Sequence, residues 1–252
     1  LDQPLTVRYL HYLNDLVHGN LGRSYAQRVT VNSLIASHLP VTFELVLIGI
    51  AFELLIGIPI GILSAVRRRG VLDQLFTMFA FTGVSTPQFV TGLILLYVLG
   101  YLIPLFPLGG YGSGSLQHFV LPGLSLGIAG GGWYARVLRS SLVEVLHQDY
   151  IRTAKAKGAT PRKVIFHHAL RNGLLPVAAM VGMDLGVLMG GVIVVEQVFS
   201  LPGIGQMMWQ AIQVVDIPVI MGIVIVTAIF VVVGNLIADL IYLFLDPRIQ
   251  YN

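Results

Sequence analysis

The segment from Asp149 to Pro176, DYIRTAKAKGATPRKVIFHHALRNGLLP, is the one long polar interval in the second half of a very apolar chain. It carries six of the fifteen lysine and arginine residues of the chain and a single acidic residue. Gly158 suits the left-handed conformation that often follows the last turn of a helix. Thr160 followed by Pro161 is typical of an N-cap and a first helical position. The segment therefore predicts two short helices joined at a corner.

Three interpretations of this corner compete. It is a basic loop that only fixes orientation in a membrane, a helix-turn-helix whose basic face contacts nucleic-acid phosphates, or a pair of helices held at a membrane surface for a soluble partner. In the second helix Pro161, Val164, Ile165 and Ala169 are expected on one apolar side. Apolar stretches flank the segment on both sides, which argues against nucleic acid.

The composition indicates a protein that faces lipid. The chain has 252 residues, of which 56% are hydrophobic and 11% are charged, whereas a soluble domain has about 25% charged residues. There is no cysteine, which excludes disulfides and thiolate metal sites. The adjacent His167 and His168 would point about 100° apart on a helix, a poor chelate. We therefore expect neither a metal site nor a bound cofactor.

Five apolar stretches are expected to cross the bilayer, which takes about 20 residues each. They cover residues 41–66, 72–103, 119 onward through a more polar end, 174–195 and 218–245. Ser85-Thr86-Pro87 interrupts the second, and a Ser85 or Thr86 hydroxyl is expected to satisfy the carbonyl that the proline frees. Residues 1–40 hold no such run and are predicted to be an extracytoplasmic segment before a transmembrane domain at 41–252.

The basic residues predict the orientation of these spans. Arg67–Arg69, the polar segment and Arg248 fall on one side, and the loops at 104–118 and 197–216 contain no lysine or arginine. The positive-inside rule then places residues 147–176 and the C-terminus in the cytoplasm. Five spans with an external N-terminal segment predict one further span before Leu1, six in all.

Small residues recur in the fourth span. Gly182, Gly186 and Gly190 share one helix face, which lets another helix approach closely in lipid. Packing within this chain is the favoured interpretation, and contact with a second membrane subunit is the alternative.

Acidic residues in or near the spans raise the possibility of a secondary transporter or a channel-like protein with a basic cytoplasmic loop. These residues are Glu44, Glu53, Asp184, Glu196 and Asp239. No lysine or histidine lies deep in a span to partner them, and they share no motif spacing, so proton coupling is the weaker alternative. The glycine-rich 109–115 loop lacks the lysine of a phosphate-binding loop. No catalytic arrangement is present, so the chain is not expected to be an enzyme by itself.

Two motifs resemble one protein family. Thr153, Ala154, Gly158 and the later Leu175-Pro176 resemble the coupling-loop signature of the membrane permeases of ABC importers. The sequence DYIRTAKAKG is similar to that of the dipeptide, oligopeptide and nickel branch of the family. Arg152 stands where the motif usually has an acidic residue. The loop from Glu196 to Gly205 resembles the external loop of the same branch through Glu196, Phe199, Ser200, Pro202, Gly203 and Gly205.

The resemblance implies an all-α integral membrane protein with the transmembrane domain of a type I ABC importer, in the inner membrane of a prokaryote. It implies a second homologous permease subunit, two cytosolic ATPase subunits that bind Mg-ATP, and an external solute-binding protein that delivers peptides or a small solute such as nickel. It places the ATPase contact at Arg152, Thr153, Ala154, Lys155, Lys157 and Gly158, and an outer gate or receptor contact in the 196–205 loop.

Overall fold

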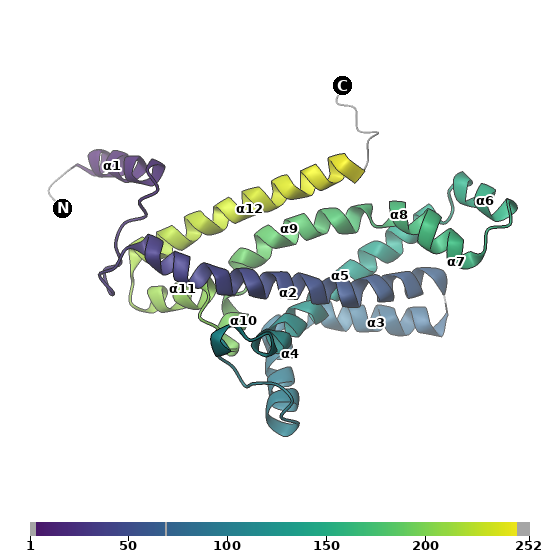
Figure 1. Cartoon of the computed structure of the whole chain (residues 1–252), viewed down its shortest axis with the longest axis horizontal. Helices are drawn as coiled ribbons and strands as arrows, with labels where there is room; N and C mark the ends of the chain where they lie inside the picture. Colours follow the sequence, from purple (N-terminus) through teal and green to yellow (C-terminus); the bar gives the residue numbers. More distant parts are fainter. Residues whose placement is uncertain (1–3, 69, 246–252) are drawn as a thin grey trace.

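The computed structural model of the chain describes residues 4–68 and 70–245, and helices carry almost all of its regular structure. Four long helices run side by side along the long axis of the molecule (Figure 1), namely α2 (Val31–Val66), α5 (Gln117–Val145), α9 (Leu175–Gly191) and α12 (Ile217–Leu245). Arg69 and the C-terminal Asp246, Pro247 and Arg248 lie outside the described residues.

Shorter helices occupy the two ends and one side of this bundle. One end carries α6 (Asp149–Ala156), α7 (Pro161–Lys163), the π-helical turn η3 (Val164–Ala169) and α8 (Leu170–Gly173). The opposite end carries α1 (Leu5–Val17), α10 (Ile193–Val198) and α11 (Ile204–Gln213). Between α2 and α5 the chain forms α3 (Val71–Ser85), α4 (Gln88–Leu95), η1 (Leu96–Leu102) and η2 (Gly112–Gly114).

Glycine brings α2 and α5 into close contact. A Cβ atom added at Gly57 would lie 2.5 Å from Cβ of Tyr134, and one added at Gly127 would lie 2.4 Å from Cβ of Phe52. A real Cβ atom does not lie so close to another heavy atom. The two helix backbones can therefore approach each other this closely only because these positions are glycine. In lipid, where hydrophobic burial drives helix association weakly, such close packing is a main source of attraction.

The predicted interruption at Ser85-Thr86-Pro87 is a sharp corner. The axes of α3 and of the α4–η1 helix differ by 103°, and α4 projects sideways from the bundle (Figure 1). The hydroxyl of Thr86 donates to the carbonyl of Thr82 at 2.8 Å, which also accepts from the backbone N–H of Thr86 at 3.0 Å. The carbonyl that Pro87 frees is that of Gly83, so this hydrogen bond is not the one that the sequence predicted. The sequence predicted the break but not its angle.

The described residues contain two helices that are long and apolar enough to cross a bilayer alone, α2 and residues Ile217–Ile241 of α12. Counting each of two bent helix pairs, α3 with α4–η1 and Pro161–Gly173 with Leu175–Gly190, as one broken span gives up to four. The remaining expected span is α5, whose 29 residues include glycines and two arginines. We count α5 as a membrane span because of its position rather than its hydropathy: it packs against α2, α3 and α9 in the middle of the bundle.

The first long helix starts earlier than the apolar run predicted. It begins at Val31, inside the stretch expected to be an extracytoplasmic segment, and continues without a break through Pro40. Thr30 caps it by accepting a hydrogen bond from the backbone N–H of Ser33 at 3.4 Å. With 36 residues, α2 is about 54 Å long at 1.5 Å per residue. It therefore extends well beyond a hydrocarbon core of about 30 Å.

Candidate functional site

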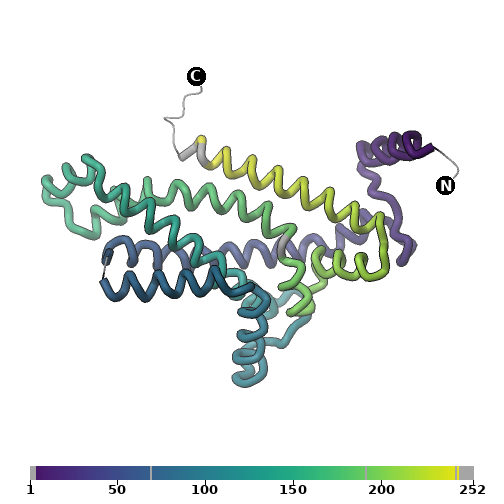
Figure 2. The backbone as a smooth tube through the Cα atoms, turned by 180° about the vertical axis from the view of Figure 1, so that it is seen from behind, coloured from purple at the N-terminus to yellow at the C-terminus, as the bar shows by residue number. Residues whose placement is uncertain are grey.

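The polar segment forms a two-helix elbow, residues 149–173, at one end of the bundle (Figure 2). Gly158 follows α6 with a φ of 82°, the left-handed conformation expected of it. Thr160 caps α7 by accepting a hydrogen bond from the backbone N–H of Lys163 at 3.4 Å. Both predictions of the corner are confirmed. A Cβ atom added at Gly158 would meet nothing within 4 Å, so the corner is open on its outer side.

Apolar side chains fasten the elbow to the bundle. Ile151 of α6 and Ala169 of η3 are fully buried, and Val164 is 2% exposed. They join one cluster with residues of the long helices, which comprises Ala65, Tyr134, Leu138, Leu142, Ile151, Val164, Ala169 and Val177. Burying each large aliphatic side chain stabilises this arrangement by about 1.5–3 kcal/mol. The elbow is therefore packed directly on α5.

The outer surface of the elbow is basic and accessible. Of the six residues predicted to contact an ATPase, five are exposed and Ala154 is half-buried. The guanidinium of Arg152 lies 3.7 Å from the carboxylate of Asp149, but both side chains are at least 80% exposed. An ion pair so exposed contributes at most about 1 kcal/mol. These basic side chains are thus available to a negatively charged partner.

Two aromatic residues of the elbow were not singled out in the sequence. Phe166 is 65% exposed and Tyr150 is 41% exposed, and the hydroxyl of Tyr150 accepts a hydrogen bond from Nδ2 of Asn172 at 2.9 Å. The π-helical turn Val164–Ala169 rotates its residues relative to an ordinary helix. The prediction that Pro161 lies on the apolar side is wrong, because this residue is exposed. An exposed aromatic side chain beside a basic surface is typical of a protein interface.

The 196–205 loop lies at the opposite end of the bundle and is held by one carboxylate. Glu196 is fully buried; its Oε1 accepts from the hydroxyl of Thr42 at 2.6 Å and its Oε2 from the backbone N–H of Gln206 at 2.9 Å. Thr42 in turn accepts from the backbone N–H of Ile204 at 2.8 Å. The carboxylate therefore caps the N-terminus of α11 and ties it to α2 and α10. Burial raises the pKa of Glu196 to about 7, against its hydrogen-bond donors, which lower it.

The rest of this motif packs around Glu196. A Cβ atom added at Gly203 would lie 2.1 Å from Oε1 of Glu196, and one at Gly205 would lie 2.6 Å from Cα of Ile193. Phe199 is 1% exposed, Pro202 is half-buried, and Ser200 is the one exposed residue of the six. Most of the motif thus holds the loop together from inside and leaves little of it to a surface contact.

The glycine stripe of α9 packs within the chain. Cβ atoms added at Gly182 and Gly186 would lie 2.6 Å from Cα of Ala238 and 2.7 Å from Cα of Val231, both on α12. One added at Gly190 would lie 2.6 Å from Cγ2 of Thr227. The structure thus places the stripe against α12, as the favoured interpretation expected.

A second carboxylate clamp was missed in the sequence. Asp216 is 2% exposed and precedes α12; it accepts hydrogen bonds from the hydroxyl of Ser24 at 2.5 Å and from the backbone N–H groups of Tyr25 and Ala26, each at 3.1 Å. Burial raises its pKa, but these donors outweigh that effect, so the pKa lies below its ordinary value. A loop 190 residues away supplies the donors, and no local pattern signals such a contact.

A helical bundle with broken spans and an exposed basic elbow at one end is typical of a multi-helix membrane protein. Residues 57–251 match the family described as the binding-protein-dependent transport system inner membrane component. The chain belongs to this family.

Similar proteins agree with this assignment. The chain is 41% identical to the oligopeptide transport system permease protein AppB of Bacillus subtilis, over 100% of this chain and 82% of that protein. It is 39% identical to the glutathione transport system permease protein GsiC of Salmonella typhimurium, with the same coverage of both chains. The solved inward-facing MetNI methionine ABC transporter has a chain of similar fold, with a TM-score of 0.73 and 19% identity, covering 84% of this chain and 96% of that one.

The family and its relatives define the role of the chain. It is a membrane permease subunit of an ABC importer with the type I transmembrane fold, located in an inner membrane, and it is a non-catalytic subunit. Family membership also implies ATPase subunits, a binding protein and a second permease as partners.

Proposed function

We propose that this chain forms half of the translocation pathway of a peptide importer and that its elbow is the contact for a cytosolic ATPase subunit. The observation that carries the proposal is the two-sided elbow: a basic outer surface, and an apolar inner surface in which Ile151 packs with Leu138 and Leu142 of α5. A segment that only set orientation would need the charge but not this rigid attachment.

The mechanism follows from the attachment. ATP binding draws two ATPase subunits together, the elbow moves with its ATPase, and the buried cluster passes this movement to α5 and α9. The long helices then rock and the pathway opens to the other side of the membrane. A ligand shifts such an equilibrium only through different contacts in the two states, so the elbow must hold its ATPase in both states.

The orientation belongs to the same proposal. The basic elbow and the C-terminus face the cytoplasm, and the 196–205 loop faces the external binding protein, with Ser200 as its accessible residue. The two ATPase subunits bind Mg-ATP, this chain binds no nucleotide, and a second homologous permease completes the pathway.

Peptides are the substrate class that we propose. The names of two relatives, at 41% and 39% identity, specify oligopeptide and glutathione transport, and glutathione is itself a tripeptide. A small cationic solute such as nickel is the second candidate within the same branch.

Reconstitution tests this function. Liposomes containing the permease pair and its ATPases, supplied with the binding protein, should accumulate labelled peptide only when ATP is enclosed on the elbow side. Vesicles that lack the ATPases should accumulate none. Uptake driven by a proton gradient without ATP would contradict the proposal and favour a secondary transporter.

A further inference from the structure

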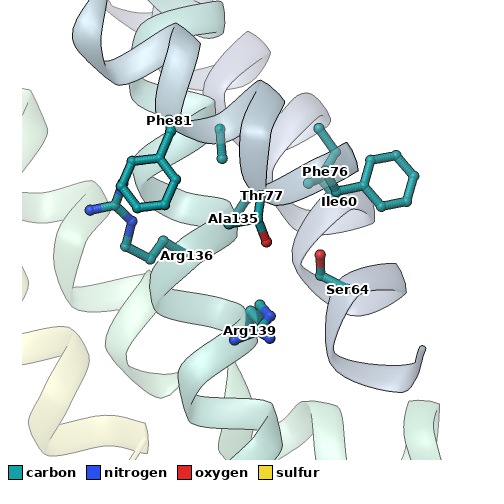
Figure 3. Close-up of a pocket in the computed structure, with 9 residues that line it drawn as sticks. Ile60, Ser64, Phe76, Thr77, Phe81, Ala135, Arg136 and Arg139 are labelled. Carbon is teal, nitrogen blue, oxygen red and sulfur yellow. The ribbon is translucent and has the colours of Figure 1, made fainter. Parts of the chain in front are cut away.

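A pocket of about 240 Å³ lies between α2, α3 and α5 (Figure 3). Ser64 on its α2 wall is adjacent to Ala65, which belongs to the buried cluster beneath the elbow. The pocket is therefore on the elbow half of the bundle. Its walls are apolar except for two hydroxyls and two guanidinium groups, and none of these groups belongs to the elbow or to the 196–205 loop.

One of the two arginines is already neutralised. Nε and Nη2 of Arg139 donate to the two carboxylate oxygens of Asp73, each at 2.8 Å. This two-bond geometry is the strong form of an arginine–carboxylate pair. Arg139 therefore contributes little net charge to the pocket.

The other arginine provides the positive charge of the pocket. The guanidinium carbon of Arg136 lies 4.3 Å from the ring centroid of Phe81 and 5.5 Å from that of Trp133. Within the described part of the chain it has no carboxylate partner. The aromatic faces stabilise the cation but accept none of its five N–H donors in the plane of the guanidinium.

Two hydroxyls add further donors to the same space. Ser64 and Thr77 face each other across the pocket in Figure 3. Neither hydroxyl makes a hydrogen bond to another described residue, although Ser64 is only 2% exposed. The pocket thus offers a positive charge and several donors, and no carboxylate is among its lining residues. An oxyanion has the complementary chemistry.

The depth of the pocket fits a lipid headgroup. Ser64 is two residues before the end of α2, and Thr77 is six residues after the start of α3, about 9 Å along the helix. The surface beside the pocket is apolar, with Met78 67%, Phe81 52% and Trp133 49% exposed. Tryptophan is enriched where headgroups meet acyl chains, and basic pockets between membrane helices on the cytoplasmic side bind anionic headgroups.

We infer that this pocket binds the phosphate group of an anionic phospholipid, with Arg136 as its ionic partner, Ser64 and Thr77 as further donors, and an acyl chain along Met78 and Phe81. The assignment of this lipid to the cytoplasmic leaflet rests on the orientation given above. The binding itself needs neither ATP nor a substrate.

Native mass spectrometry of the intact transporter, purified from nanodiscs that contain phosphatidylglycerol and phosphatidylcholine, tests the inference. The parent should retain phosphatidylglycerol in preference to phosphatidylcholine. Arg136→Gln should lower that retention roughly tenfold or more, because it removes a charge-assisted hydrogen-bond donor. Arg68→Gln is the matched control: it removes a positive charge from the exposed α2–α3 corner, outside the pocket, and should retain the lipid.

Other outcomes separate the alternatives. Displacement of the lipid by millimolar inorganic phosphate would make the pocket a free-anion site, and equal retention of both lipids, or no change in Arg136→Gln, would overturn the inference. If Arg136→Gln fails to assemble, Thr77→Val, which removes one donor, should still reduce retention severalfold. If the parent transporter shows no ATP-driven uptake but still retains phosphatidylglycerol, the proposed function is contradicted and this inference stands.

Discussion

At the scale of single residues, Glu196 combines complete burial with several hydrogen-bond donors. Its pKa is raised from 4.5 to about 7, so folding favours the protonated form. The stability that this group contributes is fully present below pH 4.5 and is lost as the pH rises to 7. A change from 4.5 to about 7 corresponds to roughly 3 kcal/mol, at 1.36 kcal/mol for each pH unit.

This dependence is testable by thermal unfolding of the detergent-solubilised protein between pH 4.5 and 8. The parent should lose stability over that interval, and Glu196→Gln should make the loss smaller by roughly the contribution of this carboxyl group, because the amide does not titrate. Glu144→Gln changes an exposed carboxylate and should leave the pH profile of the parent unchanged. Identical profiles for the parent and Glu196→Gln would refute the role given to this carboxylate.

Asp216 gives a second prediction at this scale. Asp216→Ala leaves the donors of Ser24, Tyr25 and Ala26 without their acceptor, which should destabilise the fold by about 1–3 kcal/mol. The 23–28 loop should also become more sensitive to trypsin at Arg23. The measurement is the rate of cleavage beside the unfolding midpoint. Asp15→Ala, on the exposed face of α1, is the control; cleavage of Asp216→Ala at the parental rate would count against the clamp.

At the scale of helices, the α9–α12 contact depends on the absence of a side chain. Gly186→Leu would place a side chain where a Cβ alone already lies 2.7 Å from Cα of Val231. Forcing the helices apart should destabilise the protein by about 1–3 kcal/mol or more, seen as a lower unfolding midpoint. Val187→Leu enlarges a neighbouring side chain that is 62% exposed and should have little effect. Equal stability of both variants would exclude tight packing at Gly186.

Local signals in the sequence predicted the elbow well, and distant contacts explain what they missed. Gly158 and Thr160 have conformations set by their immediate neighbours, so the corner was predictable. The attachment of Ile151 to Leu138 and Leu142 depends on how α5 passes beneath the elbow. The same holds for Glu196: its partner Thr42 lies 154 residues away, so the motif could be found but its buried, structural environment could not.

At the scale of the whole molecule, apolar runs predicted most long helices and their order. They could not predict that α2 starts at Val31, because its first turns contain several polar residues. Only Val31, Leu34 and Ile35 are buried there, and they pack with residues of α11 and α12. They also could not predict the 103° turn between α3 and α4. Pro87 fixes the position of that break, whereas its direction depends on contacts of α4 with α5 and α10.

The central claim is that the elbow transmits ATPase movement to the long helices, and Gly158 tests it most directly. Gly158 and Gly19 both have positive φ, 82° and 75°, and both have open space around a Cβ atom. Replacing either by aspartate should cost roughly 1 kcal/mol in backbone strain without disturbing the fold. Gly19→Asp lies at the opposite end of the bundle and is therefore the matched control.

The measurement is ATP-driven uptake and ATP hydrolysis in reconstituted vesicles, with copurification of the ATPase subunits. Gly158→Asp should assemble in the membrane like the parent, lose most of its uptake, and either bind the ATPases weakly or hydrolyse ATP without transport. Gly158→Ala should be milder, since it adds a single methyl group, and Gly19→Asp should transport like the parent. Normal uptake and normal coupling in Gly158→Asp would show that the elbow is only an orientation loop and would contradict the claim.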